Sequence, residues 1–298
     1  MRKLWADAED AYREEILAAL PPANPSTVAL DVGCDDGAWT EVVRERLAIP
    51  PGQVAGLEIV PERAALARDR GFDVRVGDID RRWPFEDDSF DVVHANQVIE
   101  HVQRLDHFVD ETLRVLRAGG RVLVCTENLA SWHNVSALAL GYQPFSLTNV
   151  STQRPIGNPF ALHAGENGSL ESWQHVHVLS LLGLRDLFDA HGFAVTRAWG
   201  TGYHPFSGRL AEWLAAHDPR HAHFVGVAAE PRASRIATIG AALYVLLPFD
   251  GIPDFIPVVG HFDDAIIVTL AVLFVKRRWW ERLTRFARPT AASAHAQS

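Results

Sequence analysis

The sequence contains little cysteine, since Cys34 and Cys125 are its only 2 such residues. Two thiols are too few for a disulfide framework, and this scarcity favours a reducing compartment. The first residues, MRKLWADAEDAYREE, are charged and lack the apolar core of a secretory signal. We therefore expect a cytoplasmic protein.

The sequence also lacks an excess of positive charge. It has 28 Lys and Arg against 37 Asp and Glu, which gives a net charge of -9. Nucleic-acid binding depends on clustered Lys and Arg at phosphates, so we expect no nucleic-acid partner. Hydrophobic residues make up 48% and charged residues 22% of the chain, as in ordinary globular proteins. A length of 298 residues allows one large domain and one small one.

Most of the chain alternates short apolar runs with helical stretches. Candidate strands cover residues 28–32, 54–59, 73–76, 91–95, 121–126, 194–199 and 223–228. Candidate helices cover residues 4–20, 38–47, 61–70, 104–117 and 180–192. Apolar strands that alternate with helices predict an α/β fold with a parallel sheet covered on both faces. Residues 128–172 lack clear periodicity, which suggests a long insertion over a site.

A glycine-rich turn with two adjacent carboxylates follows the first predicted strand, in LDVGCDDGAWT. Glu58 closes the second strand, and Asp78 follows the third. In a parallel sheet, ligands bind outside the carboxyl ends of the strands. An acidic set at that edge suits a ligand with hydroxyls, amines and positive charge better than one with phosphates. The nicotinamide-dinucleotide fingerprint G-x-G-x-x-G is absent, because the glycines here are Gly33 and Gly37.

These motifs together resemble the class I S-adenosylmethionine-dependent methyltransferases. The resemblance covers roughly residues 25–230 and includes DVGCDDG, Glu58, VGDID, FDVVHANQVIEHV and LRVLRAGGRVLVCTEN. It implies a Rossmann-like sheet of seven strands, mostly parallel with the last antiparallel, and helices on both faces. It also implies S-adenosylmethionine as the cofactor. One departure is Asp35, which stands where the family usually has glycine.

The resemblance implies a set of cofactor contacts. Asp31 and Gly33 would hold the methionine amino end, Glu58 the ribose hydroxyls, and Asp78 the adenine amine. The full set of predicted cofactor-binding residues is Asp31, Gly33, Cys34, Asp36, Gly37, Glu58, Ile59, Asp78, Ile79, Ala95 and Asn96. Cys34 is also a candidate for simple packing beneath the turn. No metal-binding residue is predicted in this domain.

The implied reaction is an in-line displacement in which a nucleophile attacks the methyl carbon. A hydroxyl acceptor must also lose a proton, and histidine suits a base near neutral pH. The predicted catalytic residues are His101, just beyond the fourth strand, and His133, after the fifth. For His101 the alternative is a structural hydrogen bond to the neighbouring loop.

Four aromatic residues of the insertion either line an apolar pocket for the acceptor or pack the insertion onto the sheet. They are Trp132, Tyr142, Phe145 and Phe160. Relatives of this kind act on quinones, lipids, sugars and secondary metabolites, so the resemblance implies a small-molecule or lipid-like acceptor without naming it.

The predicted second domain, residues 231–298 after the first domain at 1–230, contains two uncharged runs at 236–249 and 265–275. The sequence PFDGIPDFIPVVGHFDD between them resembles the YkvA-like domain, a small family of undetermined function. Flanking arginines and the Trp279-Trp280 pair favour a helical hairpin at the inner membrane surface, through residues 232–288. A soluble hairpin packed on the first domain is the alternative. Four carboxylates here either cap helices, which we favour, or gather a cation: Asp250, Asp254, Asp263 and Asp264.

The sequence therefore predicts a methyltransferase acting on a small-molecule or lipid-like acceptor. An alternative is a non-catalytic S-adenosylmethionine-binding or regulatory protein, coupled to a membrane-associated C-terminal module. A third interpretation makes the C-terminal module the functional part and the larger domain its sensor.

Overall fold

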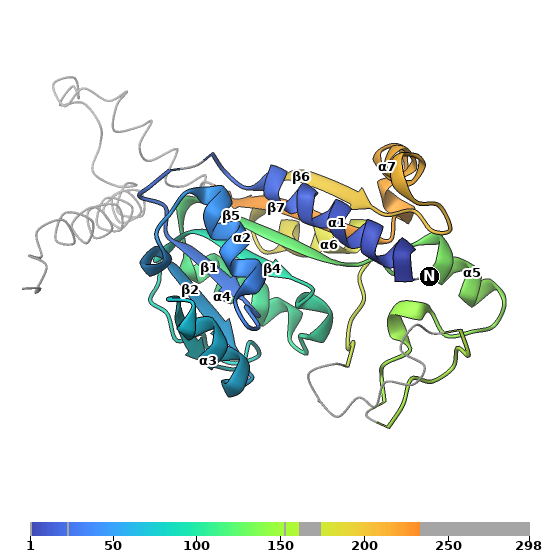
Figure 1. Ribbon diagram of the computed structural model, residues 1–298, viewed down its shortest axis with the longest axis horizontal. Helices are drawn as coiled ribbons and strands as arrows, with labels where there is room; N and C mark the ends of the chain where they lie inside the picture. The colour runs from blue at the N-terminus through green and yellow to red at the C-terminus, as the bar shows by residue number, and fades with distance from the viewer. Residues whose placement is uncertain (1, 23, 152, 161–173, 233–298) are drawn as a thin grey trace, which may run out of the picture. The chain divides into compact units, whose positions relative to one another are not determined.

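The computed structural model describes residues 2–22, 24–151, 153–160 and 174–232 (Figure 1). These residues belong to one compact unit that ends at Arg232. The predictions for the C-terminal segment, including its two apolar runs and its four aspartates, lie outside the described residues.

A seven-stranded sheet forms the centre of this unit, in the order β3-β2-β1-β4-β5-β7-β6. The strands are β1 (Ala29–Val32), β2 (Val54–Glu58), β3 (Asp73–Val76), β4 (Phe90–Asn96), β5 (Leu116–Glu127), β6 (Phe193–Thr201) and β7 (Phe224–Pro231). Strands β1 to β5 pair in parallel, whereas β7 runs antiparallel to both β5 and β6. The predicted α/β class, with a mostly parallel seven-stranded sheet and an antiparallel last strand, is confirmed.

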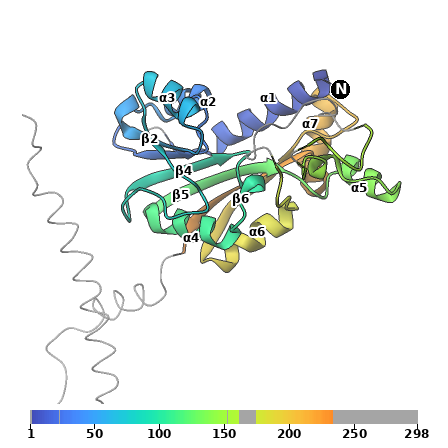
Figure 2. The same ribbon diagram turned by 90° about the horizontal axis from the view of Figure 1, so that it is seen from below.

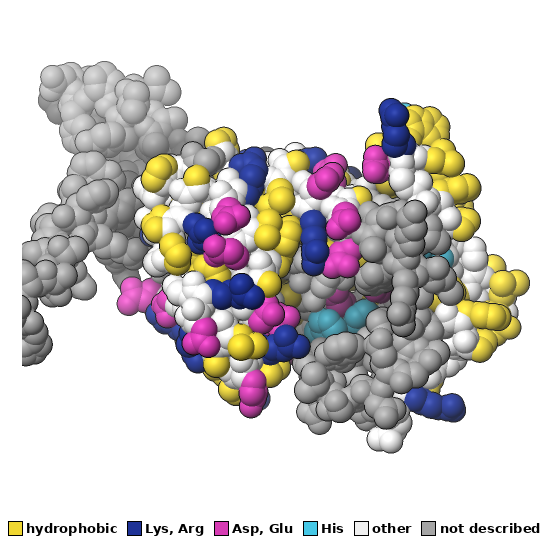
Figure 3. All heavy atoms as spheres, viewed as in Figure 1, with side chains coloured by type: hydrophobic (Ala, Val, Ile, Leu, Met, Phe, Trp, Pro, Cys, Tyr) yellow, Lys and Arg dark blue, Asp and Glu magenta, His cyan; other side chains and the backbone are white. Residues whose placement is uncertain are grey.

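Helices cover both faces of the sheet. The helices are α1 (Arg2–Ala19), α2 (Ala38–Leu47), α3 (Pro61–Asp69), α4 (Leu105–Val115), α5 (Trp132–Ala139), α6 (Leu181–Ala190) and α7 (Gly208–His217). Figure 2 shows α1, α2 and α3 on one side of the strands, and α4 and α6 on the other. On the side that carries α1 and α2, acidic and basic side chains are interspersed (Figure 3).

Two hydrophobic clusters fill the space between the sheet and these helices. Successive side chains of a strand alternate between them: Leu30 joins the cluster with α4 and α6, and Ala29 the cluster with α1, α2 and α3. In β5, Val122 and Leu123 divide in the same way. Because both sides of each central strand are buried, these strands are largely apolar, with buried polar exceptions such as Asp31 and His94.

Two helices differ from the sequence-based expectation. Helix α5 lies within residues 128–172, where no helix was expected, and α7 follows β6 where none was expected either. The buried residues of α7 are Ala211 and Ala215, and those of α5 are Asn134 and Ala137. Small or polar buried residues give a weak apolar period, which explains why the sequence pattern missed both helices.

Candidate active site

The turn between β1 and α2 has the backbone that its glycines permit. Gly33 and Gly37 have φ angles of 71° and 78°, in the left-handed region. A Cβ atom on Gly33 would lie 2.5 Å from Cγ2 of Val98, so only glycine fits there. Asp35 also lies in the left-handed region, with φ of 49°, and its carboxylate is 3.3 Å from Nε of Arg63. Aspartate tolerates this conformation better than most residues, so the turn keeps its form without the usual glycine.

Glu58, at the end of β2, ties this turn to the next strand. Its Oε2 accepts a hydrogen bond from the Asp35 N–H at 3.0 Å, and its Oε1 accepts one from the Val60 N–H at 2.9 Å. Each carboxylate oxygen can accept a second hydrogen bond. The side chain therefore shapes the turn and retains the capacity to accept two hydroxyl groups.

Asp31 lies beneath the turn, buried at 4% exposure. Its Oδ2 accepts from the Thr40 hydroxyl at 2.5 Å, and its Oδ1 lies 2.7 Å from Nδ1 of His94. Nε2 of His94 accepts from the Trp39 indole at 3.4 Å, so Nδ1 is the nitrogen that donates to Asp31. These bonds connect β1, α2 and β4. Both oxygens of Asp31 thus have protein partners, and the assignment of the methionine amino end to Asp31 stays a prediction.

Asp36 and Cys34 of the same turn have structural contacts. Oδ1 of Asp36 accepts from the Ala38 N–H at 2.9 Å, at the first turn of α2. Cys34 is buried, and a Cβ on Gly56 would lie 2.6 Å from its Sγ, so the thiol fills the space above that glycine. Burial raises the pKa of the Cys34 thiol, which keeps it protonated and unreactive.

The predicted adenine contacts lie after β2 and β3. Ile59 is 50% exposed beside Glu58, a position where an apolar side chain is open to a ligand. Oδ1 of Asp78 accepts from the Asp80 N–H at 2.9 Å. Ile79 packs against the core, and its carbonyl accepts from the Trp83 indole at 3.1 Å. The assignment of adenine to Asp78 and Ile79 stays a prediction.

The end of β4 carries polar atoms whose hydrogen bonding is incomplete. Ala95 is buried in the core, and the next residue, Asn96, is the last residue of β4. Oδ1 of Asn96 and Nε2 of Gln97 are buried without a hydrogen-bond partner among the described residues. Gln97 also has a left-handed backbone, with φ of 54°. Sequence reasoning missed Gln97, although its place directly after Asn96 was a signal that could have found it.

His101 ends a short 3-10 helix, Ile99–His101, beyond β4. Its Nδ1 lies 3.1 Å from the carbonyl of Gln174. A carbonyl only accepts, so Nδ1 carries the proton and the lone pair is on Nε2. Burial lowers the pKa of His101, so the ring is uncharged near neutral pH. The structure thus gives His101 a hydrogen bond to the loop through Nδ1 and leaves the ring's lone pair on Nε2.

Glu100 and His175 lie beside His101. Ligand atoms of the three residues lie within 4.8 Å of one another, and the rings of His101 and His175 are 4.9 Å apart. Glu100 accepts from the Thr126 hydroxyl at 2.8 Å. Burial raises the pKa of Glu100 to about 7, and neighbouring Glu127 adds to this effect. We call these three residues the Glu100 cluster.

His133, the other predicted catalytic residue, lies in a different group. It lies in the first turn of α5, and its ring lies 4.6 Å from that of His223 and 5.3 Å from that of His204. Burial, helped by His204, lowers the pKa of His133 to about 3. A group with this pKa is a weak base at neutral pH, so His101 is the better base of the two.

The four aromatic residues of the insertion do not form one wall. Trp132 stacks on His221 at 4.3 Å and donates to the Tyr203 hydroxyl at 2.7 Å. Tyr142 and Phe160 contact each other edge to face at 6.0 Å, and both are exposed. Phe145 alone of the four lies against His133, at 5.6 Å.

None of the helices in the described part of the chain has both the length and the apolar character needed to cross a bilayer.

Two sequence families match this chain. Residues 4–198, more than half of the chain, match the family described as a methyltransferase domain. Residues 234–270 match a family described as a protein of unknown function, DUF1232, which confirms the YkvA-like prediction.

Individual proteins also match this chain, over shorter stretches than the family does. An uncharacterized 37.1 kDa protein in transposon TN4556 of Streptomyces fradiae is 34% identical over 123 residues, which cover 40% of this chain and 35% of that protein. The mitochondrial ubiquinone biosynthesis O-methyltransferase of Rattus norvegicus is 25% identical over 188 residues, which cover 60% of this chain and 48% of that enzyme. The chain thus spans half or less of the length of these curated relatives.

A solved structure shares the fold. It is a methyltransferase in complex with the Haloferax volcanii Trm112 methyltransferase activator, with a TM-score of 0.52 and 16% identity over 78% of this chain and 94% of that chain. The chain therefore belongs to the methyltransferase-domain family, and its seven-stranded fold is that of the class I S-adenosylmethionine-dependent methyltransferases.

Proposed function

We propose that this chain transfers the methyl group of S-adenosylmethionine to a small molecule bound at the carboxyl ends of β4 and β5. The observation that carries the proposal is the polar edge formed by Glu58, Asn96 and Gln97. These side chains have hydrogen-bond acceptors and donors that can still bind a ligand. The family's cofactor supplies a methyl group already activated on a sulfonium.

The residues of this edge match the polar groups of that cofactor. Glu58 has two oxygens that can each accept one ribose hydroxyl, while it continues to hold the turn. Oδ1 of Asn96, which has no partner among the described residues, suits an ammonium group, and Nε2 of Gln97, in the same position, suits a carboxylate. An acceptor and a donor on adjacent residues fit the amino-acid end of the cofactor.

For the acceptor we propose a hydroxyl group on a small, ring-bearing molecule of the quinone-precursor type. His101 holds an uncharged imidazole whose Nε2 can take the hydroxyl proton. The rat relative is named for ubiquinone biosynthesis, which supports this acceptor class. The chain's own contribution is then to orient the acceptor, exclude water and accept a proton.

The cofactor site is tested by replacing Glu58. We expect Glu58→Ala to weaken S-adenosylhomocysteine binding by at least about tenfold, because each hydrogen bond to a charged group is worth roughly 1.5–3 kcal/mol. Isothermal titration calorimetry measures the affinity, and Glu62→Ala, at an exposed position in the first turn of α3, is the matched control. Glu58→Gln keeps one carbonyl oxygen and should lie between the two. Equal affinity in all four proteins would remove the basis of the proposal.

Binding alone does not separate an enzyme from a regulatory binder. Asp35, which stands where the family usually has glycine, is an argument for the regulatory alternative, but this residue has a left-handed backbone that aspartate tolerates and an ion pair with Arg63. A transfer assay with labelled S-adenosylmethionine and a panel of hydroxylated benzoquinone precursors distinguishes the two functions. Tight cofactor binding with no transfer to the panel or to extracted metabolites would favour the regulatory function.

A further inference from the structure

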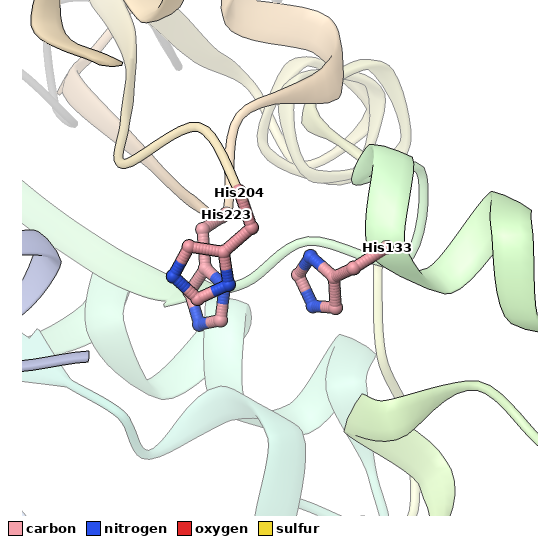
Figure 4. Close-up of side chains that lie close together, drawn as sticks. All are labelled: His133, His204 and His223. Carbon is pink, nitrogen blue, oxygen red and sulfur yellow. The ribbon is translucent and has the colours of Figure 1, made fainter. Parts of the chain in front are cut away.

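Three histidines from distant parts of the sequence meet at one point. Ligand nitrogens of His133, His204 and His223 all lie within 4.8 Å of one another. The ring centroids are 4.6 Å apart for His133 and His223, and 4.4 Å apart for His204 and His223. Figure 4 shows the ring of His133 facing the overlapping rings of the other two. We call these residues the three-histidine cluster.

Each histidine is placed by a different element. His133 lies in the first turn of α5, and His223 immediately precedes β7, where its N–H donates to the Gly202 carbonyl at 2.8 Å. His204 follows Tyr203, whose hydroxyl donates to Asp218 at 2.6 Å. Because β7 is antiparallel to β5, its first residues lie at the carboxyl end of β5, next to α5. The cluster is therefore a product of the fold, not of a local sequence motif.

Burial keeps the rings of His133 and His223 uncharged. Burial is the main cause that lowers the pKa of His133 and of His223, and the neighbouring histidines lower both further. All three members of the cluster are histidines, so each offers an imidazole nitrogen as a ligand. Uncharged imidazole is the form in which histidine binds metals.

We propose that His133, His204 and His223 bind one divalent transition-metal ion, with zinc as the best fit. Three imidazoles with a fourth position open is a known arrangement for zinc, whereas magnesium and calcium prefer oxygen ligands. Tetrahedral zinc with Zn–N bonds of about 2.0–2.1 Å places its nitrogens roughly 3.4 Å apart. Small side-chain rotations bring nitrogens that already lie within 4.8 Å of one another to that spacing.

The Glu100 cluster is the other group of described residues that could hold a metal ion. It differs in chemistry, because it combines one carboxylate with two imidazoles, and Nδ1 of both His101 and His175 faces a backbone carbonyl. It also contains the base of the proposed reaction. A variant of each cluster therefore distinguishes the two sites, and a binding measurement keeps the metal question independent of methyl transfer.

The test uses the full chain, stripped of metal and titrated with Co²⁺ and then Zn²⁺. Absorption bands of Co²⁺ in the visible range report tetrahedral nitrogen ligation, and competition with a chromophoric chelator gives the Zn²⁺ affinity. The test variants are His133→Asn and His204→Asn. His175→Asn reports on the Glu100 cluster, and His177→Asn, at a histidine outside both clusters, is the control. Circular dichroism establishes that each variant is folded.

We expect the wild-type chain to bind a single Co²⁺ with intense tetrahedral bands. The bands should vanish in His133→Asn and His204→Asn, and Zn²⁺ affinity should fall by more than about 100-fold, since loss of a mere outer-shell partner already costs roughly 10–100-fold. His175→Asn and His177→Asn should bind as the wild type does. If one test variant does not fold, the wild-type spectrum and the other variant decide. Absence of tetrahedral bands in the wild type, unchanged affinity in the test variants, or loss in His175→Asn alone would each overturn the proposal.

Discussion

Glu100 is a carboxyl group that the fold has removed from water. Burial raises its pKa to about 7 from 4.5, so between these pH values the folded chain keeps a proton that the unfolded chain has released. The folded state is then stabilised at the acid side of this window, and stability falls as the pH rises from 4.5 to 7. The shift corresponds to about 3 kcal/mol across the window.

We expect Glu100→Gln to remove this pH dependence. The variant should gain stability relative to the wild type as the pH rises from 5 to 7.5, by about 2–3 kcal/mol. Urea unfolding at the two pH values measures the difference. Glu62→Gln, at an exposed carboxyl, should follow the wild type at both pH values. The interpretation fails if wild type and Glu100→Gln lose the same stability over this range.

His101 can be tested by a substitution that keeps its structural hydrogen bond. Asparagine can still donate to the Gln174 carbonyl but supplies no basic nitrogen at the position of Nε2. We expect His101→Asn to slow methyl transfer to hydroxyl acceptors by roughly 100-fold or more, with cofactor affinity unchanged. Single-turnover kinetics and calorimetry measure the two quantities, and His177→Asn is the control. A variant with full activity would reduce His101 to a structural role.

At the scale of elements, the turn between β1 and α2 combines two constraints. Gly33 has a left-handed backbone, and it also lies against Val98, which leaves no room for a Cβ atom. Gly192 shares the first constraint, with φ of 83°, but nothing lies within 4 Å of its Cβ position. A comparison of alanine substitutions at Gly33 and Gly192 therefore separates the effect of backbone strain from that of steric contact.

We expect Gly33→Ala to destabilise the domain by about 1–3 kcal/mol more than Gly192→Ala, because only the former adds overpacking to backbone strain. Urea unfolding of both variants measures this difference. Cofactor affinity should fall in Gly33→Ala as well, since Val98 lies next to the turn that follows β1. Equal destabilisation by the two substitutions would contradict the steric argument.

The elements also show what the sequence could and could not predict. The sequence pattern located all seven strands of the sheet. Burial on both faces explains the apolar pattern of central strands such as β2, whereas β3 and β6 are only partly buried. Helix α7 was missed because it buries only Ala211 and Ala215, which carry little periodic signal. The sequence named Glu58 as a strand-end carboxylate, but not its bonds to the Asp35 and Val60 backbones. The three-histidine cluster depends on the antiparallel direction of β7, which no local pattern specifies.

At the scale of the whole molecule, the role of the C-terminal segment can be considered apart from the chemistry of the first domain. Its arginines and paired tryptophans are typical of a segment that contacts an anionic membrane surface, where each basic residue contributes about 1 kcal/mol. We propose that the C-terminal segment, through residues 232–288, brings the protein to such a surface. This position would suit a lipid-like, quinone-type acceptor.

Vesicle flotation tests this attachment. We expect the full chain to float with phosphatidylglycerol vesicles and less with phosphatidylcholine vesicles, because charge drives part of the binding. A chain ending at Arg232, the boundary of the compact unit, should stay in the soluble fraction with both. Equal partition of the two chains would show that the C-terminal segment does not anchor the protein.

The order of strands has a consequence for translation. Strand β7 is the last of the sheet to be synthesised, yet it lies between β5 and β6 and pairs with both. A nascent chain that has emerged only as far as β6 exposes an open edge on each of those strands, and open edges template aggregation. Shortened genes that stop before Phe224 should therefore yield inclusion bodies, whereas those that continue through Pro231 close the sheet.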